Sequence, residues 1–241
     1  MAGHSKWKNI QATKNKNDKQ RAKIFTKLSR EIIVAVKEGG PNPDTNSKLR
    51  DVIAKAKAAN VPNDNVNRVI ARASGNVDQS NYESITYEGY GPAGVAVIVE
   101  CMTDNRNRTA SEMRHYFDKY GGNLGATGCV SWSFDSKGVI VIERGDLDED
   151  QVMMDALDAG ASDFEAEDES FIIFTEPGEF SVVREALEKN DYSFVSAQVE
   201  MVPQNYVTLS DEDSIKNMNK LIEMLEDNDD VQQIWHNWEE A

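Results

Sequence analysis

The stretch Gly138–Val202 reads GVIVIERGDLDEDQVMMDALDAGASDFEAEDESFIIFTEPGEFSVVREALEKNDYSFVSAQVEMV. Short β-branched and aromatic runs alternate in it with longer segments whose apolar residues recur every three or four positions, which predicts strands and helices. In chain order the predicted elements are strand Val139–Glu143, helix Glu149–Ala159, strands Asp163–Glu167 and Phe171–Phe174, helix Phe180–Glu188 and strand Phe194–Met201. This βαββαβ order is typical of a ferredoxin-like domain.

The residues on either side of this stretch predict a second α+β unit. The elements before it are a hairpin of Tyr82–Tyr90 and Val95–Thr103, a helix over Arg108–Tyr120 and a strand VSWSF at 130–134. The elements after it are a strand Tyr206–Leu209, a helix Ser214–Glu226 and a strand Val231–Trp235. The last three are too few to fold alone, so we expect them to complete the sheet begun at Tyr82. The ferredoxin-like unit would then be inserted in that second domain.

The leading segment predicts a bundle of three helices. They run from Asn17 or Asp18 to about Glu38, from Pro43-Asp44 to about Asn60, and from Asn63 or Asp64 to Gly75. A polar, turn-rich stretch, GNVDQSN, follows at 75–81 and predicts a domain boundary. We therefore expect an α+β multidomain protein with a helical domain at 1–76, a discontinuous α+β domain at 80–136 with 204–241, and the ferredoxin-like domain at 137–203.

Charge divides the chain at the same place. Residues 1–74 carry 16 Lys and Arg against 6 Asp and Glu, whereas the other 167 residues carry 10 against 36. The formal charges are therefore +10 and −26. Because polyanions respond to the local field, a basic segment can bind nucleic acid even when the whole chain is acidic. The acidic remainder would repel nucleic acid or meet a basic protein.

One face of the first helix concentrates this charge. On an ideal helix Lys16, Lys23, Lys27 and Arg30 fall within roughly 80° of Lys19, opposite the apolar residues. A solvated helix face usually carries both signs, but only Asp18 and Glu31 are acidic between positions 1 and 32. The predicted nucleic-acid-binding residues are Lys6, Trp7, Lys8, Lys14, Lys16, Lys19, Arg21, Lys23, Lys27 and Arg30, and we expect Lys19, Lys23 and Lys27 to be exposed. Trp7 could stack on a base, or it could pack on the bundle.

A second candidate site follows a predicted strand. Arg106 and Arg108, in the sequence DNRNRT at 104–109, could hold a phosphate at the start of a helix. Alternatively the segment is an ordinary helix start, with Asn107 or Thr109 as the cap and Asp104 paired with an arginine. We keep both interpretations and treat the two arginines as second-tier contacts for RNA or a partner.

Other motifs predict structure rather than chemistry. The glycine-rich GGNLGATG at 121–128 lacks the GK[ST] of a phosphate-binding loop, so we expect a tight turn. The three histidines have no metal-ligand spacing, and the carboxylates of 145–183 fall mostly in turns. We therefore expect no catalytic residue, no metal and no cofactor. A metal-dependent nuclease remains the competing enzyme class.

Several bulk features point to the cytoplasm. No apolar run approaches the ~18 residues of a membrane span, and the first residues, MAGHSKWKNI, are polar and basic. Cys101 and Cys129 belong to no CxxC pattern, which favours reduced thiols over a disulfide. We expect a cytoplasmic protein that does not associate with a membrane, as a monomer or weak homo-oligomer.

Five blocks of the sequence closely resemble the YebC family. They are MAGHSKW at the start, IFTKLSREI at Ile24–Ile32, YEGYGPAGVA at Tyr87–Ala96, TDNRNRTASEMRHYF at Thr103–Phe117 and GGNLGATGCVSWSF at Gly121–Phe134. The blocks are long and in order, and the resemblance covers essentially the whole chain. It implies three domains, a helical one and two α+β ones, with a ferredoxin-like domain inserted in the other.

The resemblance also implies a function. Members are described as probable transcriptional regulators that bind promoter DNA, and others as translational activators, with bacterial members linked to ribosomes stalled at proline runs. The nucleic-acid surface suggested for the family maps here to Lys6, Lys8, Lys14, Lys16, Lys19, Arg21, Lys23 and Lys27. Many relatives have further basic residues where this chain has Gln11 and Ala12. The basic residues of this chain thus stand at other positions than in many relatives. Such variation is compatible with phosphate contacts, which need positive charge near the nucleic-acid backbone rather than a fixed arrangement of side chains.

We therefore expect a non-enzymatic, DNA-binding regulator of transcription. The alternative is a translation activator that binds the ribosome through ribosomal RNA. A purely protein-binding adaptor is a third class, for which the cations of the first helix would not matter.

Overall fold

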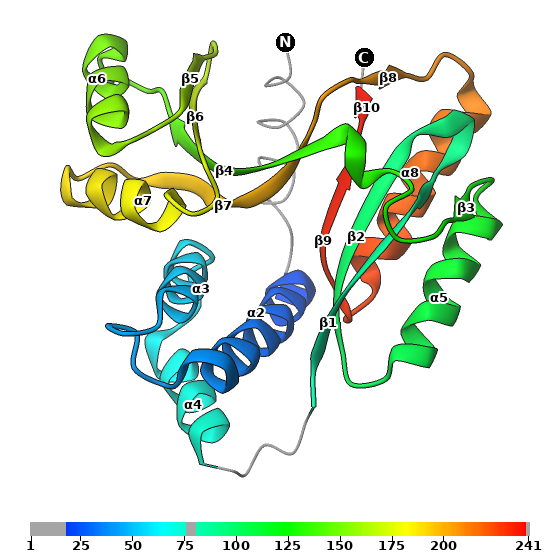
Figure 1. Cartoon of the computed structure of the whole chain (residues 1–241), viewed down its shortest axis with the longest axis horizontal. Helices are drawn as coiled ribbons and strands as arrows, with labels where there is room; N and C mark the ends of the chain where they lie inside the picture. Colours follow the sequence, from blue (N-terminus) through cyan, green and yellow to red (C-terminus); the bar gives the residue numbers. More distant parts are fainter. Residues whose placement is uncertain (1–17, 76–80, 240–241) are drawn as a thin grey trace.

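The computed structural model describes residues 18–75 and 81–239, with side chains from Ala22 onward. Figure 1 shows a helical bundle and two α+β domains, one of them inserted in the other. The fold is α+β with antiparallel sheets, as the sequence predicts. No helix in the described ranges is long and apolar enough to cross a membrane.

The bundle consists of α2 (Asp18–Gly39), α3 (Ser47–Ala58) and α4 (Asn63–Ser74). Its core joins the apolar stripes of the three helices and includes Leu28, Ile32, Leu49, Val52 and Val66. Burial of these stripes stabilises helices that would be marginal alone.

The predicted start of α3 at Pro43-Asp44 was wrong, because the helix begins at Ser47 with Asn46 as its cap. The Asn46 side chain accepts a hydrogen bond from the Leu49 amide, at 3.0 Å. Its Nδ2 donates to the carbonyls of Ala35 and Gly40, each at 2.8 Å. One buried amide thus caps α3 and ties it to the end of α2.

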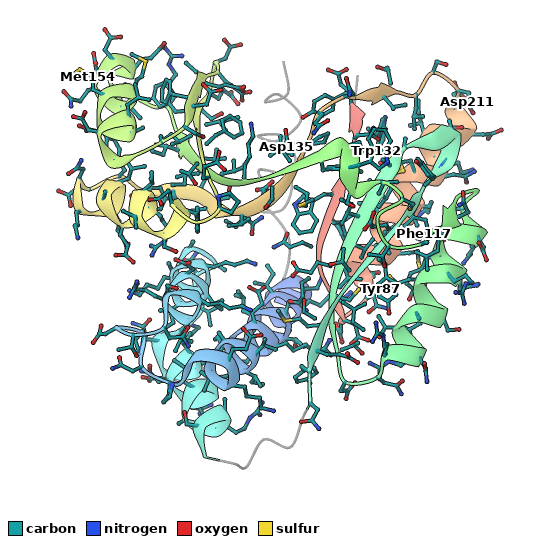
Figure 2. The ribbon with its side chains drawn as sticks, in the orientation of Figure 1. Tyr87, Phe117, Trp132, Asp135, Met154 and Asp211 are labelled. Atoms are coloured by element: carbon teal, nitrogen blue, oxygen red, sulfur yellow. The ribbon has the colours of Figure 1, made fainter. Side chains whose placement is uncertain are left out.

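The outer α+β domain has a four-stranded sheet in the order β3-β1-β2-β9. Its elements are β1 (Glu83–Tyr90), a 3₁₀ turn (Pro92–Gly94), β2 (Ala96–Thr103), α5 (Arg106–Lys119), β3 (Asn123–Leu124), α8 (Glu212–Asp227) and β9 (Val231–His236). Helices α5 and α8 pack on one face of the sheet, where Phe117 of α5 (labelled in Figure 2) is fully buried. Since β9 pairs with β2, the last part of the chain returns to the first sheet.

The inserted domain consists of β4 (Phe134–Glu143), α6 (Glu149–Ala159), β5 (Asp163–Ala166), β6 (Ser170–Thr175), α7 (Phe180–Lys189) and β7 (Phe194–Pro203). Its strand order is β5-β6-β4-β7, the ferredoxin-like arrangement. The pairing of β4 with β7 begins where Phe134 faces Pro203. The chain therefore enters and leaves this domain at one place. Beyond it, β8 (Val207–Thr208) pairs in parallel with β10 (Trp238–Glu239) in a separate two-stranded sheet. The expectation that the strand Tyr206–Leu209 joins the sheet begun at Tyr82 was therefore wrong, and β9 alone of the last strands joins it among the described residues.

The predicted strand at 130–134 was wrong. Ser131–Ser133 form a 3₁₀ turn, and β4 begins only at Phe134. The cause is buried Glu88, whose carboxylate accepts the amides of Gly128, Val130 and Ser131 at 2.8–3.0 Å. Amides bonded to a carboxylate cannot join a strand ladder, so this segment turns instead.

Candidate nucleic-acid interface

The structure describes three side chains of the predicted nucleic-acid-binding set in full. Lys6, Trp7, Lys8, Lys14 and Lys16 lie outside the described residues, and Lys19 and Arg21 lie in α2 at positions whose side chains are not described. Lys23, Lys27 and Arg30 follow one another along α2 at intervals of four and three residues. That spacing places them on one side of the helix, as predicted. We call these three residues the basic face of α2.

An acidic turn of the outer domain lies against this basic face. It comprises Glu226–Asp230, with the sequence EDNDD, which are the last two residues of α8 and the three residues that lead to β9. Lys23 Nζ contacts Asp227 Oδ1 at 2.5 Å, and Lys27 Nζ donates to the Glu226 carbonyl at 3.1 Å. Both lysines are therefore held by oxygens of the acidic turn.

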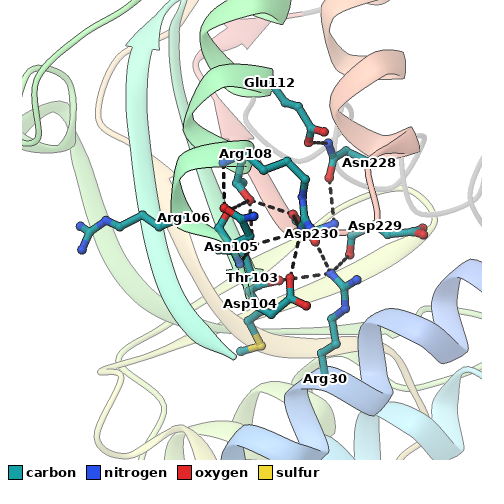
Figure 3. A network of polar contacts seen from close by, with 12 residues as sticks. Arg30, Thr103, Asp104, Asn105, Arg106, Arg108, Glu112, Asn228, Asp229 and Asp230 are labelled. Atoms are coloured by element: carbon teal, nitrogen blue, oxygen red, sulfur yellow. Dashed lines mark hydrogen bonds and ion pairs between the residues drawn. The ribbon is translucent and has the colours of Figure 1, made fainter. Parts of the chain in front are cut away.

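Arg30 is the most deeply engaged of the three cations (Figure 3). Its Nη1 donates to Asp230 Oδ1 and to the Asp229 carbonyl, each at 2.6 Å, and to the Met102 carbonyl at 3.2 Å. The guanidinium also lies over the ring of Tyr82, 5.1 Å from the centroid. Arg30 therefore joins the bundle to the outer domain.

Asp230 receives cations from two domains. Its Oδ2 accepts Arg108 Nη2 at 2.7 Å and Thr109 Oγ1 at 2.8 Å, while its Oδ1 accepts Arg30. Burial of the carboxylate opposes its ionisation, but the hydrogen bonds from Arg108, Thr109 and Arg30 outweigh burial and lower the pKa of Asp230. Asp230 is thus an ionised, buried link between α2 and α5.

All three members of the basic face are only partly exposed, so the predicted exposure of Lys23 and Lys27 was wrong. Burial lowers the pKa of Lys27 despite the nearby Glu226. Lys23 retains 37% side-chain exposure. The sequence could not reveal this, because the covering residues lie about 200 positions away along the chain. Nucleic-acid contact by these cations stays a prediction.

The second-tier arginines differ from each other. Arg108 pairs with Asp104 at 3.1 Å as well as with Asp230, which confirms the predicted pairing of Asp104 with an arginine. The cap of α5 is Asn105, whose side chain accepts the Arg108 amide, so the predicted caps Asn107 and Thr109 were wrong. Arg106 is 67% exposed, with its Nη1 at 3.9 Å from Glu83. Arg106 is the more open of the two, since Arg108 is 42% exposed and already paired with two carboxylates.

The bundle makes a second polar contact, with the inserted domain, that the sequence did not reveal. Arg50 Nε contacts Glu185 Oε1 at 2.5 Å, and Asp51 accepts Ser181 Oγ at 2.6 Å. Asp51 also accepts Arg184 Nε at 3.3 Å, although Arg184 is 2% exposed. Helix α3 is therefore tied to α7 by charged groups.

The bundle has further cations that the sequence analysis did not single out. On α4, Arg68 and Arg72 are exposed, and Lys57 is exposed at the end of α3. Arg68 and Arg72 are four residues apart and so share a side of the helix. The signal was present in the sequence as NRVIAR, an Arg pair at helical spacing among apolar residues.

Three of the other motifs have structural roles. A Cβ on Gly122 would lie 2.4 Å from the Tyr90 carbonyl oxygen. The glycine therefore lets the backbone of this segment pass close to the backbone at the end of β1. His236 is half-buried, and desolvation of its ring lowers its pKa to about 4. Cys101 and Cys129 are free thiols, and burial raises the pKa of Cys101 to about 12. Within the described ranges, no group of His, Cys, Asp and Glu could hold a metal ion.

Comparison with known proteins gives matches over nearly the whole chain. Residues 5–76 match the model of the TACO1/YebC protein N-terminal domain, and residues 82–238 that of the TACO1/YebC second and third domain. Proteins from Acetivibrio thermocellus and Caldicellulosiruptor bescii, each named a probable transcriptional regulatory protein, are 64% and 62% identical. The match covers 99% of both chains for the first, and 100% of this chain and 99% of the relative for the second.

A solved structure has the same fold. The crystal structure of a conserved hypothetical protein from Aquifex aeolicus superposes with a TM-score of 0.83 at 46% identity. The superposition covers 92% of this chain and 91% of that one.

Proposed function

Since the chain belongs to the TACO1/YebC family, we propose that it is a non-enzymatic regulator of gene expression that binds nucleic acid through its basic helical domain. The relatives' names as probable transcriptional regulatory proteins support regulation. The interface comprises the basic face of α2 together with Lys6, Trp7, Lys8, Lys14, Lys16, Lys19 and Arg21. Arg68 and Arg72 of α4 extend it, and Arg106 is a second-tier contact.

One observation carries this proposal. The basic face of α2 already binds a row of oxygens, because Lys23, Lys27 and Arg30 each contact the acidic turn. Cations at one-turn intervals that hold carboxylate and carbonyl oxygens have the chemistry to hold phosphate oxygens. The net charge of +10 on residues 1–74 attracts a polyanion to that face.

Salt dependence tests the electrostatic mechanism. If about six phosphates are neutralised, log affinity should fall with log salt at a slope of about −5 for duplex DNA, or about −4 for a single strand. The measurement is a fluorescence-anisotropy titration of a labelled 20-base-pair duplex or a 20-nucleotide RNA at several salt concentrations. A slope near zero would contradict the proposal.

Substitution of Lys19, Lys23 and Lys27 by Ala tests which cations bind. For duplex DNA each lost phosphate contact should make the slope about 0.9 less negative, so the triple variant should lose two to three units of slope. A matched control, K37A/K48A/K57A, removes three charges from other parts of the bundle. Equal loss in both variants would show that only total charge matters. Circular dichroism checks that both variants fold.

The favoured target is promoter DNA, and the alternative is ribosomal RNA with a role in translation. Crosslinking of the tagged protein in cells, with RNA and DNA sequenced in parallel, separates the two. Enrichment of discrete promoters without a ribosomal signal would make the protein a transcription regulator. Enrichment of defined ribosomal RNA positions that the triple variant loses would make it a translation factor.

A further inference from the structure

We propose that the acidic turn is an intramolecular competitor of nucleic acid, so that the protein is autoinhibited until a phosphate backbone takes the lysines of α2 from it. This competition presupposes the nucleic-acid binding proposed above. Four of the five residues of the turn are acidic, and its oxygens hold all three cations of the basic face. A polyanion that binds these lysines must therefore displace the turn.

The contacts between the basic face and the acidic turn are weak at Lys23 and strong at Arg30. Lys23 and Asp227 are 37% and 65% exposed, so their pair is weak and is screened by salt. Arg30 and Asp230 are only 15% and 4% exposed and are held by further hydrogen bonds. Nucleic acid can thus take the outer lysines while Arg30 stays with Asp230.

The acidic turn itself is fixed to the outer domain. Asn228 Nδ2 donates to Glu112 Oε2 at 2.8 Å and to the Tyr116 hydroxyl at 3.2 Å, both on α5. Asp230 is held by Arg108 and Thr109 of the same helix. The turn therefore stays with α5, and the release is a separation of the Lys23 and Lys27 side chains from the turn. If these lysines are released only part of the time, the apparent affinity for nucleic acid is reduced in proportion to the released fraction.

Neutralisation of the turn should strengthen binding. The variant E226Q/D227N/D229N changes only exposed carboxylates and leaves Asn228 and Asp230 in place. If the wild-type lysines are free about one tenth of the time, affinity for the labelled duplex or RNA should rise about tenfold. The control D146N/D150N/D158N neutralises three exposed carboxylates of the inserted domain. It has the same net charge as the turn variant, so it reports the effect of overall charge alone.

A zero-length crosslink tests the displacement directly. A carbodiimide activates the Asp227 carboxylate, the Lys23 amine attacks it, and an amide forms as a urea leaves. The contact at 2.5 Å should give this crosslink in the free protein, detected by peptide mass spectrometry. A saturating probe without terminal phosphates should suppress it, and protein already crosslinked should bind the probe more weakly.

The outcomes separate this inference from the proposed function. Tighter binding by the turn variant than by the control, with loss of the crosslink on probe binding, supports competition. If the wild type and the control bind but the turn variant binds no tighter, or if the crosslink persists at saturation, autoinhibition is wrong and nucleic-acid binding stands. If no form of the protein binds either probe, both are wrong.

Discussion

At the scale of single residues, Asp230 links elements that are far apart in the chain. Its carboxylate joins Arg30 of α2 to Arg108 and Thr109 of α5. In the sequence Asp230 is the last of four acidic residues in EDNDD. Nothing in this pattern distinguishes it from the neighbouring acidic residues, which are exposed. Its role could not be predicted, because it depends on partners 121 to 200 positions away.

Replacement of Asp230 by Asn should destabilise the protein strongly. Removal of one partner from a buried ion pair leaves uncompensated charge and typically costs 3–5 kcal/mol; we expect about 3 kcal/mol here, because Arg108 keeps Asp104. Urea denaturation measures the loss. Asp227→Asn, two-thirds exposed in the same turn, should change stability by less than about 1 kcal/mol. Equal effects of the two substitutions would contradict a structural role for Asp230.

The stabilisation by Asp230 should depend on pH. The folded-state pKa of this carboxyl lies below the usual value of 3.8, so its stabilisation is fully present well above pH 3.8. It is lost as the pH falls from there through the lower folded pKa. The difference in unfolding free energy between wild type and Asp230→Asn should therefore be constant near neutrality and shrink below about pH 4. If the difference in unfolding free energy grew as the pH fell, a lowered folded-state pKa of Asp230 would be contradicted.

At the scale of elements, local pattern located most helices and strands. Helix α6 has the predicted bounds, and the ends of α2, α4 and α7 differ by one residue or two from those predicted. These elements have regular apolar spacing and nearby caps or turns, so local signals suffice. The segment at 130–134 alternates like a strand but is held by Glu88, more than 40 residues upstream. Local pattern fails where a distant side chain takes the backbone amides.

Asn46 offers a test at the start of α3. Asn46→Ala removes the cap of α3 and leaves the carbonyls of Ala35 and Gly40 without their amide donor. Loss of a cap costs about 1 kcal/mol and a buried unmet acceptor about 1–3 kcal/mol, so we expect a total of about 2–3 kcal/mol. Thermal unfolding measures it. Asn46→Asp, which keeps the cap but not the amide donor, should also be destabilised, because its carboxylate would face two carbonyls.

At the scale of the whole molecule, two groups of polar contacts among the residues that the structure describes join the bundle to the other domains. One is the basic face of α2 with the acidic turn, and the other joins α3 to α7. The sequence predicted the three domains but not their contacts, since ionised side chains give no local sign of their partners. The charge division that predicted a nucleic-acid surface also favours contact between the basic and acidic domains.

Replacement of Asp51 by Asn should loosen the α3–α7 contact. It removes the charge that the buried Arg184 shares with the bundle, leaving Arg184 with Glu185 and Glu188 of its own helix. We expect a loss of about 2 kcal/mol in coupling and a separate, earlier unfolding transition of the bundle in calorimetry. Lys48→Ala breaks an exposed pair within the bundle and should leave a single transition. A single transition in both variants would contradict coupling through this contact.

The acidic turn also has a place in the order of synthesis. A ribosome makes the basic helix about 200 residues before the residues that cover it, and domains fold as they emerge. The sheet of the outer domain is complete only after β9 has been synthesised, because β9 pairs with β2. Throughout translation of the intervening chain, the lysines of α2 are therefore uncovered beside the ribosome's own RNA. The nascent protein meets a dense polyanion before the acidic turn that covers these lysines exists.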